Sequence, residues 1–523
     1  MNPTNHPIRS KIIICLLFAL SAVFGCFAQD KDWRPVTAEE LAAKTPVVEP
    51  DADAEAIFWE VRVDDSSTSQ LTLKHYVRVK IFTERGREQF SKHDLPFTKG
   101  TKIKDVEVRV TKPDGSSVVI NKEDVVERDI IKANGFKLRA KSFAPPGLEA
   151  GSILEFRYSE VADGASANMR LIFQRDIPLR NVTYWVKPFQ GQAGMAFQRF
   201  NAGDTGFEKD KNGFFKASMT NVPAFHEEVS MLPEDEVKKW IYLYYRNDTA
   251  KTSEEYWKLN SSTMFDLSKS LFKANDDVKA ATAQATAGAT TDEEKLHKIY
   301  DFVKHEIRNL SYAEHATEDE KKKAREIKSP SETLKAKKAF AGDIDTLFGA
   351  MAKAAGFDVR LALSGDRSEL FFNPQIANMR LMLNSTSVAV KVGNDWRFFS
   401  PASYFVPFGM LSWYEEFQTA LITDPKELIW KEIPMSPASA SMEHRTGKFK
   451  LLEDGTLEGE ARIEFTGHLA ARYKSRNRED SNEERESTLK ELIKSNILGT
   501  AEVNSFTIEN VSDPDKPVVY TFK

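Results

Sequence analysis

The stretch that decides the fold is Ser331–Arg360, SETLKAKKAFAGDIDTLFGAMAKAAGFDVR. Two acidic residues, Asp343 and Asp345, precede a run that is rich in leucine and alanine. Carboxylates are favoured at the start of a helix because they meet free backbone amides and the positive end of the helix dipole. The pattern therefore predicts a helix that these two carboxylates open.

This stretch resembles the central segment of the transglutaminase-like fold, a papain-related α/β scaffold whose members use a Cys-His-Asp triad. In that family the segment reads approximately K-x-G-x-C-x-D, then a Leu/Ala-rich helix, then A-x-G-hydrophobic-x-A/V-R. The same frame here gives Lys337-Lys338, then Ala341-Gly342-Asp343, then Ala355–Arg360. The resemblance places Ala341 at the position of the nucleophilic cysteine, and a methyl group cannot form the reacting thiolate.

The other two triad positions follow from the same frame. Active relatives show N-H before a strand and D-P after the next strand, about fifteen residues on. Asn384 and Pro401 match that frame, whereas Ser385 and Ser400 stand at the histidine and aspartate positions. No histidine lies between positions 315 and 444, so a small shift cannot restore the base. Because a triad needs a nucleophile, a base and a group that orients the base, the resemblance implies that all three roles are vacant.

A serine could replace the cysteine as nucleophile. The hydroxyls near this frame belong to Ser385, Ser387 and Ser400, and the nearest carboxylates belong to Asp343, Asp345 and Asp395. A serine nucleophile needs an adjacent base, and a helix-start role already accounts for Asp343 and Asp345. We therefore favour the interpretation that these serines are ordinary strand and turn residues.

The N-terminus has the pattern of an export signal. Arg9 and Lys11 precede the apolar run from Ile12 to Phe27, which is too short to span a bilayer comfortably. Cleavage after Ala28 would give a mature chain with no cysteine, because Cys15 and Cys26 both lie in the leader. The alternative is a lipoprotein anchored at Cys26, which we disfavour because the preceding Phe24 suits that motif poorly. We expect a periplasmic or secreted protein without a transmembrane segment after signal removal.

The composition indicates a globular protein of several domains. The 523 residues are 41% hydrophobic and 29% charged, with a net charge of −5. The leader carries two basic residues and no acid, so the remaining chain is slightly more acidic. This balance offers no basic face for nucleic acid. No nucleotide-binding glycine motif and no spaced metal-ligand pattern occurs, so we predict no cofactor and no metal.

The first third of the chain predicts a β-sandwich. Alternating apolar and basic residues from Leu73 to Ile81 have the period of a strand with one wet face. Thr111–Gly115 predicts a hairpin turn, because proline presets φ and glycine accepts positive φ. The segments from Val77 to Gly86, Val106 to Gly115 and Pro145 to Tyr158 resemble domain of unknown function 3857, an exported β-domain that commonly precedes a transglutaminase-like domain in bacteria. That resemblance implies architecture and no chemistry. The expected strands are 56–63, 71–83, 101–110, 117–120, 136–140, 153–159 and 170–187.

The predicted fold class is therefore α+β and multidomain, with an N-terminal β-sandwich, a central transglutaminase-like α/β domain and a β-rich C-terminal region. Thr291 and Glu294 have the spacing of a capping box and predict a helix start. The chain ends on a strand-like segment, 518–523, which we interpret as a sign of an incomplete domain. The expected divisions are 1–28 signal peptide, 29–54 poorly ordered lead-in, 55–225 β-sandwich, 226–290 helical connector, 291–430 transglutaminase-like domain and 431–523 β-rich region.

Our first functional hypothesis is a non-catalytic protein that binds or scaffolds a protein, peptide or glycan partner in the cell envelope. The competing hypothesis is a peptidase or transglutaminase-type enzyme that uses other residues. Joint replacement of all three triad positions favours the first, since loss of one position alone could be compensated. Residues that could line a binding cleft are Asp343, Trp396, Tyr404 and Trp413.

Overall fold

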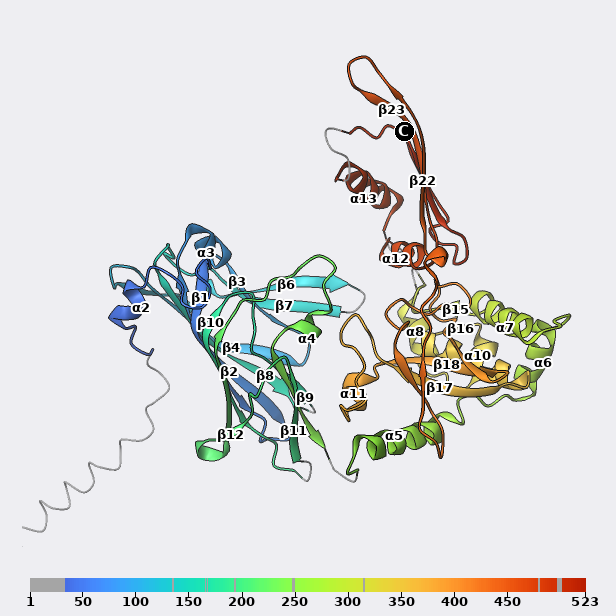
Figure 1. The fold of residues 1–523 in the computed structure, drawn as a ribbon, viewed down its shortest axis with the longest axis horizontal. Coiled ribbons are helices and arrows are strands. Elements are labelled where there is room, and N and C mark those ends of the chain that lie inside the picture. The colour runs from blue at the N-terminus through green and yellow to red at the C-terminus, as the bar shows by residue number, and fades with distance from the viewer. Residues whose placement is uncertain are drawn as a thin grey trace, which may run out of the picture. The chain divides into compact units, whose positions relative to one another are not determined.

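The computed structural model describes residues 33–133, 136–164, 166, 168–191, 194–246, 250–313, 316–477, 480–495 and 501–523. The predicted leader, with Cys15 and Cys26, lies outside these residues. The chain divides into two compact units, one formed by Met1–His226 with Lys239–Tyr245 and the other by Glu227–Lys238 with Arg246–Lys523 (Figure 1).

The first unit is almost entirely β-structure. Its helices are short: α2 (Ala38–Ala42), α3 (Glu84–Gln89), η1 (Lys122–Asp124) and η2 (Lys211–Gly213). Its strands are β1 (Ala54–Asp64), β2 (Gln70–Ile81), β3 (His93–Phe97), β4 (Thr101–Thr111), β5 (Ser117–Val119), β6 (Val126–Ala133), β7 (Phe136–Phe143), β8 (Ile153–Asp163), β9 (Asn168–Ile172), β10 (Leu179–Lys187), β11 (Gly194–Phe200), β12 (Glu208–Lys209), β13 (Phe215–Val222) and β14 (Trp240–Arg246).

These strands form one large sheet and two small ones around a common core. The large sheet has eight strands in the order β12-β13-β10-β1-β2-β8-β4-β5, and the small sheets are β11-β14-β9 and β3-β7-β6. Val77 and Val79 of β2 are fully buried in the core, together with Leu171 of β9, Ile241 of β14 and Phe97 of β3. The predicted hairpin at Thr111–Gly115 joins β4 and β5, and Gly115 has a φ of 85°.

The outer face of β2, which we predicted to be wet, is covered by the N-terminal segment. Arg78 and Lys80 are 3% and 1% exposed. The Arg78 guanidinium donates hydrogen bonds to the backbone oxygen of Arg34 at 2.7 Å and to Glu40 of α2 at 2.9 Å. Lys80 donates to the backbone oxygen of Leu41 at 2.8 Å. The prediction that the lead-in is poorly ordered is therefore wrong for residues 33–53, because two buried cations of the sheet bind its backbone carbonyls.

Among its described residues, the second unit mixes helices with three sheets. Its helices are α4 (Glu234–Val237), α5 (Ser253–Ser268), α6 (Asp276–Ala285), α7 (Asp292–Glu306), α8 (Glu318–Ala324), α9 (Pro330–Ala336), α10 (Ala341–Ala354), α11 (Met379–Met382), η3 (Ala438–Ala440), α12 (Gly467–Asn477) and α13 (Asn482–Ser495). Its strands are β15 (Arg308–Asn309), β16 (Lys338–Ala339), β17 (Asp358–Ser364), β18 (Ser385–Val392), β19 (Asp395–Phe399), β20 (Thr419–Ile422), β21 (Ile429–Glu432), β22 (Glu443–Leu451), β23 (Leu457–Phe465), β24 (Phe506–Glu509) and β25 (Val518–Phe522).

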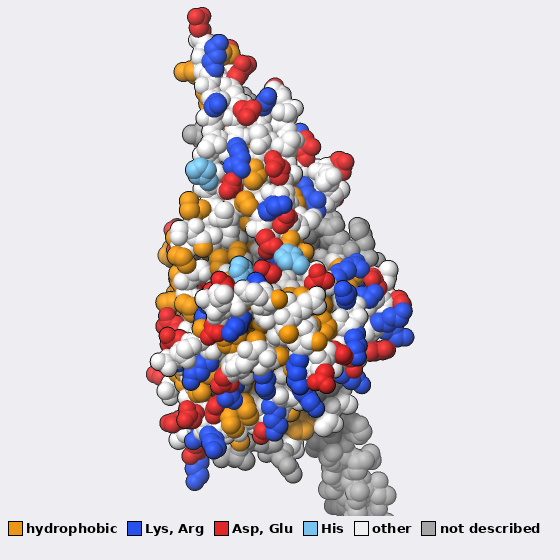
Figure 2. All heavy atoms as spheres, turned by 90° about the vertical axis from the view of Figure 1, so that its right-hand side faces the viewer, with side chains coloured by type: hydrophobic (Ala, Val, Ile, Leu, Met, Phe, Trp, Pro, Cys, Tyr) orange, Lys and Arg blue, Asp and Glu red, His pale blue; other side chains and the backbone are white. Residues whose placement is uncertain are grey.

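Helix α10 is the centre of this unit. It packs with α7 against the sheet β19-β18-β17-β20-β21, and Leu347 and Phe348 of α10 are fully buried with Val390 of β18. The predicted capping box at the start of α7 is present, with Thr291 and Glu294 each bonded to the other's backbone. On the face of this unit seen in Figure 2, acidic and basic side chains are intermixed rather than gathered by sign.

Two glycines of α10 should respond in opposite ways to alanine. A Cβ at Gly349 would lie 2.4 Å from the ring of Phe272, whereas a Cβ at Gly342 would meet nothing within 4 Å. Gly342→Ala should stabilise the protein by up to about 1 kcal/mol, because alanine is the better helix former. Gly349→Ala should destabilise it by about 1–3 kcal/mol through overpacking. Urea unfolding followed by circular dichroism at 222 nm compares the pair, and equal effects would contradict the packing of Phe272 on α10.

The C-terminal part of this unit is a four-stranded sheet, β22-β23-β25-β24, packed on α12 and α13. Strand β25, which covers the strand-like segment predicted at 518–523, lies between β23 and β24 and pairs with both. Its residues Val518 and Tyr520 are buried against Ala470 of α12 and Leu489 of α13. The charged stretch between β23 and β24 contains two helices, α12 and α13.

One strand lies in the stretch predicted as a helical connector. β14 pairs antiparallel with β9 of the first unit, and its residues from Trp240 to Leu243 are fully or almost fully buried. A continuous apolar run of this length does not distinguish a buried strand from a buried helix by period. Among the described residues, no helix has the length and apolar character to cross a membrane.

Candidate functional site

The site predicted from the sequence lies at the start of α10. Phe340 is the N-cap and Ala341 the first helical residue, as the frame requires. The preceding residues, Lys338 and Ala339, form β16, which pairs in parallel with β15. The backbone N–H of Ala341 donates to the hydroxyl of Ser311 at 3.2 Å. A short parallel pair therefore leads directly into the helix and fixes where Ala341 lies.

Ser400 is bonded to α10 one turn after Ala341. It follows β19 directly, and its hydroxyl donates to Oδ2 of Asp345 at 3.1 Å. The other carboxyl oxygen of Asp345 accepts the backbone N–H of Ala402 at 2.9 Å. Residues four apart lie on the same face of a helix, so Ser400 and Ala341 share one side of α10. The Asp345 carboxyl group therefore binds the segment after β19, at Ser400 and Ala402, whereas we had predicted for it only a helix-start role.

Ser385 has a different neighbour. It opens β18, which pairs with β19, but its hydroxyl donates to Oε1 of Glu415 at 2.5 Å. Side chains alternate along a strand, so Ser385 shares its face with Ala389, while Val388 and Val390 pack on α10. Ser385 therefore opens β18 and Ser400 follows the adjacent strand β19, and each hydroxyl is bonded to its own carboxyl group.

A chain of hydroxyls joins the two carboxyl groups. Ser400 lies 3.2 Å from Ser403, and Ser403 lies 3.3 Å from Ser412, measured between hydroxyl oxygens. The backbone N–H of Ser412 donates to Oε2 of Glu415 at 3.2 Å. Ser400 and Ser385, at the aspartate and histidine positions of the frame, are thus part of one hydrogen-bonded network that runs from Asp345 to Glu415.

Burial dominates the electrostatics of this network. It raises the pKa of Asp345 to about 7, against which the hydrogen bonds from Ala402 and Ser400 act in the lowering direction. The charge of Glu415 raises the pKa of Asp345 further. Burial also raises the pKa of Glu415, which is 3% exposed. Asp343 is half-buried in the first turn of α10, and burial raises its pKa too.

A second buried glutamate binds the C-terminal part of the unit. Glu416 is 2% exposed and accepts hydrogen bonds from the backbone N–H of Ser436 at 3.0 Å and from its hydroxyl at 2.5 Å. His468 of α12 places Nε2 3.5 Å from Oε1 of Glu416 and 2.8 Å from the backbone oxygen of Leu411. A histidine is therefore present near the site, although it does not contact Ser385 or Ser400 in any described hydrogen bond.

The four predicted cleft-lining residues have different surroundings. Trp396 packs in the small core on the sheet face away from α10, with Phe398. Tyr404 packs in a separate cluster with Phe405. Trp413 is 45% exposed. Asp343 stays at the start of α10, and no described cavity is lined by any of the four. Within the described residues there is also no group of three or more His, Cys, Asp or Glu side chains placed to hold a metal ion.

The sequence analysis missed Glu415, Glu416 and His468. The two glutamates stand in the aromatic run Trp413–Phe417, and an acidic pair among large apolar residues is the one available signal. His468 lies outside the matched frame and reaches the site because α12 packs there. Nothing in the local sequence marks that contact.

Two domain families match this chain. Residues 68–226 match DUF3857, a domain of unknown function with a solved structure, and residues 279–396 match the transglutaminase-like superfamily. The chain therefore carries the two domains in the expected order, and its fold class is mixed α+β with a transglutaminase-like central domain. No curated protein matches it.

The chain also matches solved structures from several bacteria. A protease candidate from Parabacteroides distasonis ATCC 8503 is 13% identical, with 74% of this chain and 72% of that chain covered and a TM-score of 0.47. A cysteine protease candidate from Cytophaga hutchinsonii is 10% identical, with 64% and 78% covered and a TM-score of 0.19. A candidate nutrient-binding protein from Legionella pneumophila is 7% identical, with 58% and 94% covered and a TM-score of 0.20. At these identities and scores the likenesses decide nothing about function.

Proposed function

We propose that this is an exported protein whose transglutaminase-like domain is non-catalytic and binds or scaffolds a protein, peptide or glycan partner in the cell envelope. The observation that carries the proposal is Ala341 as the first residue of α10. That position would need a thiol for the chemistry of the superfamily, and the amides of a helix start would favour the thiolate. An alanine has nothing to ionise.

The network around Ser385 and Ser400 supports the same proposal. A triad leaves its base free to take a proton from the nucleophile. Here the two serines donate to Glu415 and Asp345, and these carboxyl groups also accept backbone N–H groups. Such bonds tie together loop, strand and helix, which is a structural use of the same positions.

The competing enzyme hypothesis has one observation in its favour. Ser385 is hydrogen-bonded to Glu415, and burial raises the pKa of that carboxyl group, as is common for a general base. A serine nucleophile paired with a glutamate base is therefore the alternative. The backbone N–H of Ser412, bonded to the other carboxyl oxygen of Glu415, would then orient the base.

Turnover separates the two hypotheses. We expect the mature protein to show no hydrolysis or amine crosslinking of glutamine peptides, and no change after iodoacetamide treatment. The Ser385→Ala variant should likewise show no turnover. Sustained turnover that Ser385→Ala abolishes and Ser387→Ala retains would overturn the non-catalytic assignment in favour of the serine enzyme.

A thiol placed at the vacant position reports whether active-site electrostatics persist. The thiol of Ala341→Cys should alkylate with a pKa near the ordinary value of about 8.5, lowered modestly by the helix start, because no histidine of the described residues is bonded there. Asp292→Cys, at the first residue of α7, measures the helix contribution alone. A pKa for the Ala341→Cys thiol several pH units below that of this control would contradict a non-catalytic site.

A further inference from the structure

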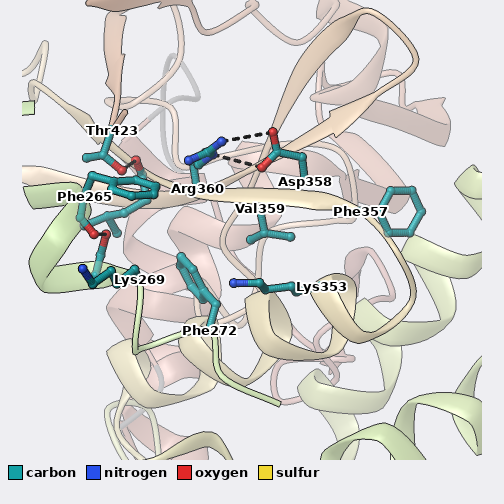
Figure 3. Close-up of a pocket in the computed structure, with 11 residues that line it drawn as sticks. Phe265, Lys269, Phe272, Lys353, Phe357, Asp358, Val359, Arg360 and Thr423 are labelled. Atoms are coloured by element: carbon teal, nitrogen blue, oxygen red, sulfur yellow. Dashed lines mark hydrogen bonds and ion pairs between the residues drawn. The ribbon is translucent and has the colours of Figure 1, made fainter. Parts of the chain in front are cut away.

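The second unit contains a cavity at the other end of α10. It has a volume of about 200 Å³ and lies between α5 and β17 (Figure 3). Its apolar wall includes Phe265, Phe272, Val359 and Leu361. α10 has 14 residues, so at 1.5 Å per residue this cavity lies about 20 Å along the helix from Ala341.

The polar groups at this cavity are mainly cationic. Lys269, Lys353 and Arg360 line it, and Asp358 is the only acidic side chain among its lining residues. Asp358 is already engaged, because its carboxylate accepts Nε of Arg360 at 2.9 Å. Lys269 pairs with Asp266 at 2.9 Å. The lining therefore carries an excess of positive charge.

Lys353 is the cation of this lining that the described residues leave unpaired. No carboxylate in the described parts of the chain lies within ion-pair distance of its ammonium group. Figure 3 shows that ammonium group directed toward the ring of Phe272, with Val359 on the strand beside it. The helix dipole favours a lysine in the last turn of α10. It does not account for a cavity with several aromatic rings beside that lysine, which is itself exposed.

We propose that this cavity binds a small carboxylate with an apolar body, whose anionic end pairs with Lys353 and whose body packs on Phe272 and Phe265. An apolar pocket with a few placed polar groups is the usual form of a small-molecule site. At roughly 30 Å³ per water, the volume corresponds to about seven waters, so the ligand is small. The source is either a free organic acid or the C-terminal carboxylate of a peptide that ends in an apolar residue.

This site is independent of the chemistry at Ala341. The proposal names a ligand class for the binding role proposed above. It rests on that role only for the purpose that such binding would serve. The test measures binding rather than turnover, so a failed binding test leaves the non-catalytic assignment standing, and discovered turnover leaves the cavity proposal standing.

A charge series on one ligand body tests the proposal with the full mature chain. We expect 3-phenylpropanoate to bind in calorimetry or ligand-observed NMR with a dissociation constant in the millimolar range. The neutral 3-phenylpropanamide and the cationic 3-phenylpropylamine should bind at least tenfold more weakly. Lys353→Ala should weaken the acid at least tenfold and leave the amide unchanged.

The matched control is Lys323→Ala, which removes an exposed lysine from the last turn of α8, outside the cavity. It should leave binding of the acid unchanged. N-acetyl-Ala-Ala-Phe and its C-terminal amide then distinguish the sources. Binding of that peptide acid identifies a peptide terminus, whereas binding of 3-phenylpropanoate alone identifies a free acid. Equal binding of acid, amide and amine, no binding of any of them, or equal losses in the two lysine variants would overturn the proposal.

Discussion

Replacing Glu155 by glutamine should destabilise the first unit by about 3–5 kcal/mol, the cost of removing one partner from a buried ion pair. Glu155 is fully buried and stands in β8 directly between Arg78 of β2 and Arg109 of β4. Its Oε1 accepts Nη2 of Arg78 at 2.8 Å, and its Oε2 accepts Nε of Arg109 at 2.8 Å. Two guanidinium groups that cannot lose their protons would be left beside a neutral amide.

Hydrogen exchange on peptides from β2 and β8 measures this loss within the first unit. The N-terminal segment should loosen with it, because Arg78 and Arg109 both donate to the backbone oxygen of Arg34. The control is Glu127→Gln, whose pairs with Arg139 and Lys141 are more exposed and should contribute about 0–1 kcal/mol. If Glu155→Gln and Glu127→Gln lose equal protection from hydrogen exchange, burial does not explain the contribution of Glu155 and its two arginine partners to stability.

The parts of the fold that the sequence predicted were those with a local physical signal. The start of α10 at Ala341 follows from acidic residues before an apolar helix, and the start of α7 follows from its capping box. The turn before β5 follows from proline and glycine. In each case the residues that decide the structure are neighbours in the chain.

The errors arose where distant segments decide the structure. Arg78 and Lys80 have the period of a wet face, and only a segment some forty residues away covers them. β14 has the apolar content of a helix or a strand and becomes a strand by pairing with β9. Burial of this kind depends on tertiary contacts, which periodicity does not encode.

The same limit applies to the candidate site. The motif spacing of the transglutaminase-like fold located Ala341, Ser385 and Ser400, because the order and spacing of the triad positions can be compared directly in the sequence. It did not reveal that Asp345 and Glu415 bind the two serines. Each of these bonds joins residues 30 to 55 positions apart, so no local pattern could have indicated it.

Asp345→Asn should stabilise the second unit at pH 8 and reduce the dependence of its stability on pH. Burial raises the pKa of Asp345 from 3.8 in the unfolded chain to about 7 in the folded one. Between these values the folded state binds a proton that the unfolded state lacks, so stability is greatest below pH 4 and falls as pH rises through 7. At 1.36 kcal/mol per pH unit, the wild type should lose about 3 kcal/mol between pH 5 and 8.

Asparagine is neutral at every pH and can keep both hydrogen bonds, accepting the N–H of Ala402 and donating to Ser400. The stability of the Asp345→Asn variant should still fall somewhat as pH rises, because burial raises the pKa of Glu415 as well. Ser400→Ala should extend the loss of stability to higher pH. The Ser400 hydroxyl lowers the pKa of Asp345, so its removal should move that pKa above 7. Urea unfolding at pH 5 to 8, followed by circular dichroism at 222 nm, reports the helical second unit. A wild-type stability that rises from pH 5 to 8, or an Asp345→Asn variant with the full wild-type slope, would show that Asp345 is ionised in the folded protein.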